Sequence, residues 1–163
     1  MIYRTQKKKL VGRYSMTIAE QSKNSNLPPT PKKPSQFWSK KLTPSLLLAS
    51  LLGTYLDLYF TGKEYYSFPM RPFPEIFSIH IFFTLVGIPL MVAMFLFICT
   101  KLTRTKRFLF ILLLSLAMSV FEKIAEPFGY FVHADVWKHY YSFFGYFVFL
   151  TIIYRFYNWT KRV

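Results

Sequence analysis

The chain has 163 residues, of which 53% are hydrophobic and 21% are aromatic, and its formal net charge is +14. Charged residues make up 17% of the sequence, whereas soluble domains average about 25%. This composition argues against an ordinary soluble domain and predicts that basic and apolar residues occupy separate parts of the chain. A single cysteine, Cys99, excludes an intramolecular disulfide framework.

Residues 1–41 form a basic, proline-containing arm with ten Lys or Arg residues and one acid, Glu20. Four prolines fall within residues 24–35, where little can be buried, so we expect this arm to be disordered. No apolar core lies within the first 40 residues, and a signal peptide is therefore not expected. Basic residues beside a membrane attract anionic lipid headgroups, so we expect lipid rather than nucleic acid as the partner of the arm.

Four apolar segments follow, at residues 42–60, 76–99, 108–125 and 140–157. A helix rises about 1.5 Å per residue and the hydrocarbon core is about 30 Å thick, so each segment is long enough to cross a bilayer. Pro89 predicts a tilt or kink in the second segment. The sequence therefore predicts an all-α fold, in which residues 42–163 form an integral membrane bundle of four transmembrane helices in up-and-down order.

Basic residues are distributed unequally between the two predicted sides of the membrane. The connection between the second and third spans contains no acid and four basic residues: Lys101, Arg104, Lys106 and Arg107. Together with the arm and the C-terminal tail, it gives one side 17 of the 21 basic residues. The positive-inside rule then predicts a plasma-membrane protein with both termini in the cytoplasm, N-in/C-in. We expect the four connection residues to contact anionic headgroups.

Acidic and histidine side chains gather at the opposite ends of the predicted spans. Ionisable groups at membrane depth are costly and tend to face the bundle interior. We therefore expect an outward-facing polar vestibule. Its candidates at the span ends are Asp57, Glu75, His80, Glu122 and Glu126, and those in and after the last loop are His133, Asp135 and His139.

Helical spacing supports an inward orientation for these residues. Ser115, Ser119, Glu122 and Glu126 recur at steps of four, three and four, which aligns them on one helix face. Small and weakly polar residues also share one face on each of the other three spans, as membrane helix interfaces require. These faces contain Ser50, Gly53, Thr54 and Asp57 on the first span, His80, Thr84 and Gly87 on the second, and His139, Ser142, Gly145 and Tyr146 on the fourth.

A divalent metal is one possible cofactor of this vestibule. Imidazole and carboxylate ligands together suit zinc, manganese or iron. His133, Asp135 and His139 would supply three ligands, with Glu122 or Glu126 as a further carboxylate. Their spacing matches no dedicated metal motif. A purely structural role for these polar residues is the competing interpretation.

The loop between the first two spans is rich in proline and aromatic residues. Three prolines within residues 69–74 stiffen it and remove main-chain donors. We expect Phe68, Pro69, Arg71 and Pro72 to lie at the membrane interface, either as a lid over the vestibule or as a rigid connector. Arg71 is expected to pair with Glu75 or Asp57.

Two blocks of sequence carry a family resemblance. The first includes Gly53-Thr54-Tyr55-Leu56-Asp57, Tyr66-Ser67-Phe68-Pro69 and the run from Arg71 to Phe77. The second includes Glu122-Lys123, Gly129-Tyr130, Trp137-Lys138-His139, Tyr141-Ser142-Phe143 and Gly145-Tyr146. Across about residues 45–160, the chain resembles an uncharacterised family of small multi-pass membrane proteins from spore-forming Gram-positive bacteria. The resemblance implies a bacterial membrane context and assigns no activity to any residue.

Three functions are compatible with these patterns. The first is a multi-pass plasma-membrane protein with a structural or accessory role, alone, as a homo-oligomer or with a membrane partner. The second is a small proton- or metal-coupled transporter or ion-binding protein that uses Asp57, His80, Glu122 and His139. The third is a membrane-embedded enzyme acting on lipid or cell-envelope substrate. No nucleophile elbow, phosphate loop or HExxH motif is present, so the enzyme has the least support.

Overall fold

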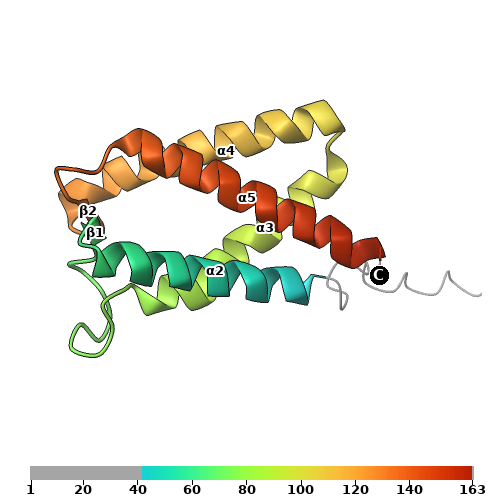
Figure 1. The fold of residues 1–163 in the computed structure, drawn as a ribbon. Coiled ribbons are helices and arrows are strands. Elements are labelled where there is room, and N and C mark those ends of the chain that lie inside the picture. The colour runs from blue at the N-terminus through green and yellow to red at the C-terminus, as the bar shows by residue number, and fades with distance from the viewer. Residues whose placement is uncertain (1–41, 163) are drawn as a thin grey trace, which may run out of the picture. The chain divides into compact units, whose positions relative to one another are not determined.

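The computed structural model describes residues 42–162, and the expected basic arm, residues 1–41, lies outside the described residues. Most of the described chain is helical, which confirms the all-α class (Figure 1). The helices are α2 (Thr43–Gly62), α3 (Ile88–Lys101), α4 (Arg104–Ala125) and α5 (His139–Arg162). Short elements connect them: β1 (Tyr66–Ser67), a π-helical turn η2 (Phe83–Gly87), a 3-10 turn η3 (Glu126–Phe128) and β2 (Val132–His133).

Within the described residues, two helical segments are long and apolar enough to cross a membrane. They are Phe83–Lys101, which joins η2 to α3, and Arg104–Phe128, which joins α4 to η3. The most apolar windows of these segments are 39% and 17% buried, respectively. The faces that point away from the bundle carry large apolar side chains, including Leu90, Met94, Leu113 and Leu116.

The helices pack as two close pairs, α2 with α3 and α4 with α5, and α2 also packs on α5. The main core lies among all four helices and includes Ala49, Val92, Leu96, Leu150 and Ile153. α3 meets α4 near their short connection, where the rings of Phe95 and Phe110 stack. A second, smaller apolar cluster of Tyr66, Phe68, Ile79 and Phe131 lies at the other end of the bundle.

The helix expected at 76–99 begins later and ends later than predicted, because its first residues form a turn. The amides of Ile76 and Phe77 both donate to the Phe73 carbonyl, and the Phe77 carbonyl accepts from Arg71 Nε at 2.7 Å. Helical structure starts at Ile81, just after His80. The His80 ring Nδ1 accepts a hydrogen bond from the Phe83 amide at 3.2 Å.

The other three predicted spans differ from the observed helices mainly at their ends. α2 closely matches the prediction of 42–60. α4 begins four residues before the predicted 108, because Thr103 has an extended backbone and its carbonyl accepts from the Arg107 amide at 2.9 Å. α5 continues past the predicted 157 to Arg162, through a polar C-terminal turn that hydropathy alone leaves out of a span.

Pro89 produces a π-helical turn in the second helix. The Ile88 amide donates to the Phe83 carbonyl, five residues back, and Pro89 has no amide hydrogen to donate to the next carbonyl, that of Thr84. The Ser50 hydroxyl of α2 donates to this carbonyl at 2.8 Å in a buried position. A side chain of one helix therefore satisfies the main-chain acceptor that proline leaves open in its neighbour.

Ser50→Ala is expected to destabilise the protein by about 1–3 kcal/mol, because the buried Thr84 carbonyl then has no donor. Chemical unfolding in detergent micelles measures this loss. Ser78→Ala removes the same hydroxyl from an exposed turn residue and is expected to leave stability within about 0.5 kcal/mol of wild type. Equal stability of the two variants would contradict this role of Ser50.

Candidate functional site

Two loops that are far apart in sequence join at one end of the bundle. β1 and β2 pair antiparallel, with Tyr66 opposite His133 and Ser67 opposite Val132. The chain reaches β2 through Gly129, whose φ of 72° is in the left-handed region that favours glycine. The Gly129 carbonyl accepts a hydrogen bond from the Met70 amide at 3.1 Å. These contacts fix the loop after α2 against the loop after α4.

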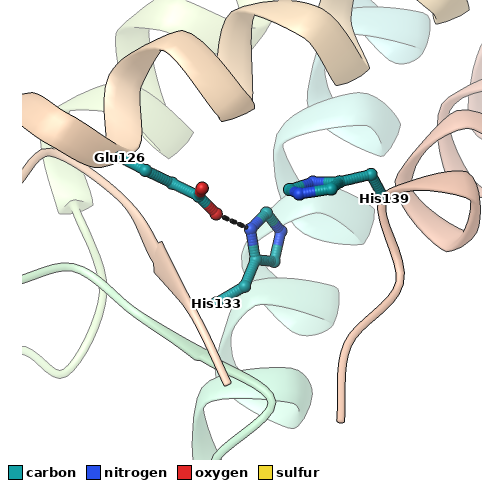
Figure 2. Close-up of side chains that lie close together, drawn as sticks. All are labelled: Glu126, His133 and His139. Atoms are coloured by element: carbon teal, nitrogen blue, oxygen red, sulfur yellow. Dashed lines mark hydrogen bonds and ion pairs between the residues drawn. The ribbon is translucent and has the colours of Figure 1, made fainter. Parts of the chain in front are cut away.

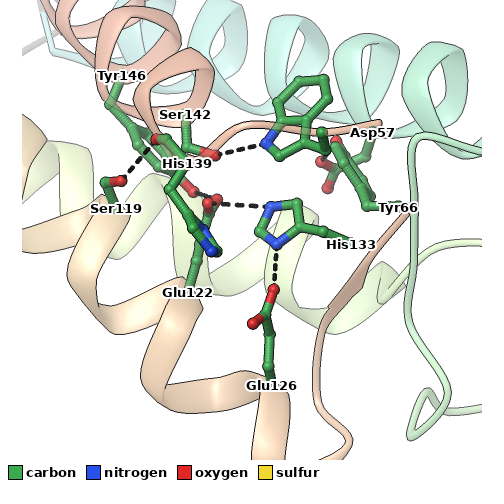
Figure 3. Close-up of polar contacts among 10 residues, drawn as sticks. Asp57, Tyr66, Ser119, Glu122, Glu126, His133, His139, Ser142 and Tyr146 are labelled. Atoms are coloured by element: carbon green, nitrogen blue, oxygen red, sulfur yellow. Dashed lines mark hydrogen bonds and ion pairs between the residues drawn. The ribbon is translucent and has the colours of Figure 1, made fainter. Parts of the chain in front are cut away.

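His133 lies between two carboxylates that come from the end of α4 and the start of η3 (Figure 3). Its Nδ1 hydrogen-bonds Glu126, and its Nε2 lies 3.5 Å from Oε2 of Glu122. The His133 side chain is 5% exposed. Glu122 and Glu126 are one helical turn apart, as predicted from the sequence, and both reach the same imidazole.

The local charges favour the protonated form of His133. Burial of the ring by itself lowers its pKa, but the hydrogen bonds and negative charges of Glu122 and Glu126 outweigh burial and raise the pKa above the ordinary value of 6.5. The group is therefore an imidazolium between two carboxylates over a wider pH range than a free histidine.

Two tyrosines hold the carboxylates that line the bundle interior. Tyr146 of α5 donates to Oε1 of Glu122, and Tyr66 of β1 donates to Oδ1 of Asp57 at 2.7 Å. Burial and the neighbouring Asp57 charge raise the pKa of Tyr66, so its hydroxyl stays a neutral donor. Asp57 Oδ2 is buried and receives no hydrogen bond, whereas the buried Glu122 Oε2 faces His133 Nε2 at 3.5 Å.

Aromatic rings enclose the His133 imidazole. Trp137 stacks on it with a centroid separation of 5.8 Å and an interplanar angle of 12°, while Phe131 and His139 approach nearly perpendicular at 4.5 Å and 5.3 Å. The Trp137 indole donates to Ser142 Oγ, and Ser119 Oγ donates to the His139 carbonyl, both at 3.0 Å. The last loop is thereby attached to α4 and α5.

A cavity of about 430 Å³ lies beside this cluster, among the halves of the helices nearest β1 and β2. Its walls are mostly apolar and aromatic, and its polar side chains include Asp57, Glu122 and His80. Gly53 and Gly145 also line it, where larger side chains would occupy the space. The remaining walls include Phe60, Phe68, Phe83, Met118, Phe121, Phe131, Trp137 and Phe149.

The structure brings together only part of the predicted metal-ligand set. Glu126, His133 and His139 each present one ligand atom, and these atoms lie within 4.8 Å of one another (Figure 2). Asp135, which the sequence suggested as a ligand, is exposed in a turn and does not belong to this group. The turn that follows β2 leaves the Asp135 side chain exposed.

The remaining vestibule candidates fall in two places. His80 and Asp57 line the cavity, whereas Glu75 is exposed in the loop before η2. No local sequence pattern marks Tyr66 as a site residue, because its position in an aromatic-rich loop indicates only an interfacial role. Its pairing with β2 depends on a contact between distant loops that no local pattern encodes.

The proline-rich loop is organised by Arg71, which donates to the carbonyls of Phe68, Pro74 and Phe77. The expected ion pair of Arg71 with Glu75 or Asp57 is wrong for the described residues, because these main-chain acceptors use the guanidinium. Of the predicted interfacial residues, Phe68 is buried and forms part of the cavity wall, Pro72 is half-buried, and Pro69 is exposed.

Of the four basic residues in the connection between α3 and α4, one forms hydrogen bonds within the fold and three are exposed. Arg107 donates to the carbonyls of Cys99 and Leu102 at the end of α3, at 3.0 and 2.6 Å, and its guanidinium lies over the Tyr154 ring of α5. Lys101, Arg104 and Lys106 are exposed. The α3–α4 connection therefore lies beside the C-terminal half of α5, away from the His133 cluster.

Comparison with protein-family models, with curated proteins and with solved structures gives no match.

Proposed function

We propose that the chain is a four-span plasma-membrane protein with both termini in the cytoplasm, and that it binds a small lipophilic cation in its outer half. α2 has 20 residues and α5 has 24, so each is about 30 Å long or more, close to the thickness of the hydrocarbon core. Both also carry large exposed apolar side chains, such as Leu51 on α2 and Val148 on α5. Such surfaces are unfavourable in water and favourable in lipid.

The orientation follows from the charges at the two ends. The exposed Lys101, Arg104 and Lys106 lie at the end that holds the C-terminal half of α5, and basic residues are enriched in cytoplasmic loops. The Glu and His cluster lies at the opposite end. The resemblance of two sequence blocks to membrane proteins of spore-forming Gram-positive bacteria favours a bacterial plasma membrane.

One observation carries the binding proposal: the cavity of about 430 Å³ is walled by aromatic side chains and contains the carboxylates of Asp57 and Glu122, and Asp57 Oδ2 is buried without a hydrogen bond. Ligand cavities typically measure about 300–1,000 Å³ and combine apolar walls with a few polar groups. Asp57 and Glu122 are the acids of the cavity wall, and no Lys or Arg lines the cavity within the described residues, so the local charge attracts a cation. Aromatic faces add cation–π attraction, which suits an organic ammonium.

Benzyltrimethylammonium is a suitable probe, because neopentylbenzene has the same shape and no charge. We expect the cation to quench or shift the fluorescence of purified protein, since Trp137 lines the cavity, and we expect the neutral analogue to bind at least tenfold more weakly. Asp57→Asn should remove this preference. Glu75→Gln, which neutralises an exposed acid outside the cavity, should retain it.

Equal binding of the charged and neutral probes would overturn the proposal. Binding of neither probe would favour the structural or accessory role, in which the polar cluster serves folding alone. Proton-coupled transport is the second candidate, favoured by the unpartnered Asp57 oxygen, and predicts that probe binding releases protons. An enzyme acting on lipid would instead show substrate turnover that Asp57→Asn abolishes without a change in folding.

A further inference from the structure

We propose that Glu126, His133 and His139 form a zinc site at the outer end of the bundle, separate from the organic ligand in the cavity. The three side chains come from η3, β2 and the start of α5, so the ion would join three elements. Figure 2 shows the Glu126 carboxylate and the His139 ring directed toward His133. This proposal does not depend on the cavity ligand.

The chemistry of the donor set suits zinc. Two imidazoles and one carboxylate form a set that zinc uses with a further water ligand. Ligand atoms at about 2.0–2.2 Å from one zinc ion lie within about 3–4 Å of each other. The donor atoms here are within 4.8 Å of one another, so small side-chain rotations are sufficient to close the site.

An unpartnered buried nitrogen points to a missing ligand. His139 Nδ1 is a buried atom without a hydrogen bond, and the His139 ring lies 5.3 Å, centroid to centroid, from the ring of His133, whose side chain is 5% exposed. Buried polar atoms of this kind are rare in folded proteins, because a polar atom that leaves water without a replacement hydrogen bond is unfavourable. An ion bound at His139 Nδ1 would supply the partner that this nitrogen lacks.

Glu122 occupies the position of an outer-shell partner. When zinc binds His133 through Nδ1, beside Glu126, the Nε2–H faces the Glu122 carboxylate at 3.5 Å. A histidine ligand commonly donates its second N–H to a carboxylate, which fixes the tautomer and the ring orientation. Glu122 is itself held by the Tyr146 hydroxyl. The arrangement therefore supplies both ligands and their support.

The experiment uses the full chain purified in detergent, stripped with a chelator, reloaded with zinc chloride and passed through a desalting column. Elemental mass spectrometry is expected to find about one zinc per chain in wild type. Glu126→Gln and His139→Asn should each lower zinc affinity at least tenfold. Asp135→Asn is the matched control, because this nearby acid is exposed and outside the group, and it should retain full zinc binding.

Absence of retained zinc in the wild-type protein would overturn the proposal, as would equal loss of zinc in Asp135→Asn. If a variant fails to fold, cobalt(II) loaded into the wild-type protein tests the site without any substitution. A site with these ligands should give visible absorption bands of four- or five-coordinate cobalt that equimolar zinc removes. A spectrum identical to that of hexa-aqua cobalt would also contradict the site.

Discussion

Leu113→Lys is expected to prevent most of the protein from reaching a folded, membrane-inserted state. Leu113 lies near the middle of α4 and is 60% exposed, so the longer side chain meets no core residue. A lysine at the centre of a transmembrane helix costs about 2.5–3.5 kcal/mol on insertion scales. On a water-facing helix, the same surface change would stay within about 0.5 kcal/mol. The size of the effect therefore reports which solvent surrounds α4.

The measurement is the amount of folded protein in the membrane fraction, followed by size-exclusion chromatography in detergent. Ile124→Lys serves as the control, because Ile124 is similarly exposed and lies near the end of α4, where a lysine can extend its ammonium to the interface. It should yield near wild-type amounts. Equal and normal yields for both variants would contradict the assignment of α4 as a membrane span.

Glu122→Ala is expected to destabilise the folded protein by about 3–5 kcal/mol, the range observed when one partner of a buried ion pair is removed. The Glu122 side chain is 15% exposed and connects three elements, because it contacts His133 of β2 and Tyr146 of α5 from its place on α4. Its removal leaves the buried tyrosine hydroxyl without its acceptor. It also removes one of the two carboxylates that pair with His133.

Equilibrium unfolding in mixed detergent micelles measures this loss. Glu122→Gln should lose less, because the amide oxygen still accepts from Tyr146, and Glu75→Ala should behave like wild type because Glu75 is exposed. A Glu122→Ala protein as stable as Glu75→Ala would show that the buried network contributes nothing to the fold.

The four helices could be predicted because apolar residues continue over many successive positions in each of them. Continuous apolar runs identified all four, and the step of three and four residues placed Ser115 and Ser119 on a buried face, which the structure confirms. The positions of the acids and histidines at the ends of the spans predicted that they lie at the same depth in the membrane. Four of them, Glu122, Glu126, His133 and His139, do cluster. Helix periodicity and residue chemistry are local properties.

Other features depend on contacts that the local sequence does not encode. Pro89 predicted a kink or tilt in the second helix, but not its π-helical form. The hydrogen bond from Ser50 to the Thr84 carbonyl also depends on how α2 packs beside that turn. His133 contacts Glu126 and not Asp135, because Asp135 lies in the exposed turn after β2. Tyr66 reaches Asp57 only because β1 pairs with β2.

Cysteine accessibility in intact cells is the most direct test of the central claim, a bundle whose polar cluster and cavity lie on the outer side. In a Cys99→Ala background, Asp135→Cys and Lys106→Cys place single thiols at exposed positions on opposite ends of the bundle. A membrane-impermeant maleimide should label Asp135→Cys in intact cells and Lys106→Cys only after permeabilisation. Labelling of both thiols in intact cells, or the reverse pattern, would contradict the four-span topology and the outward position of the site.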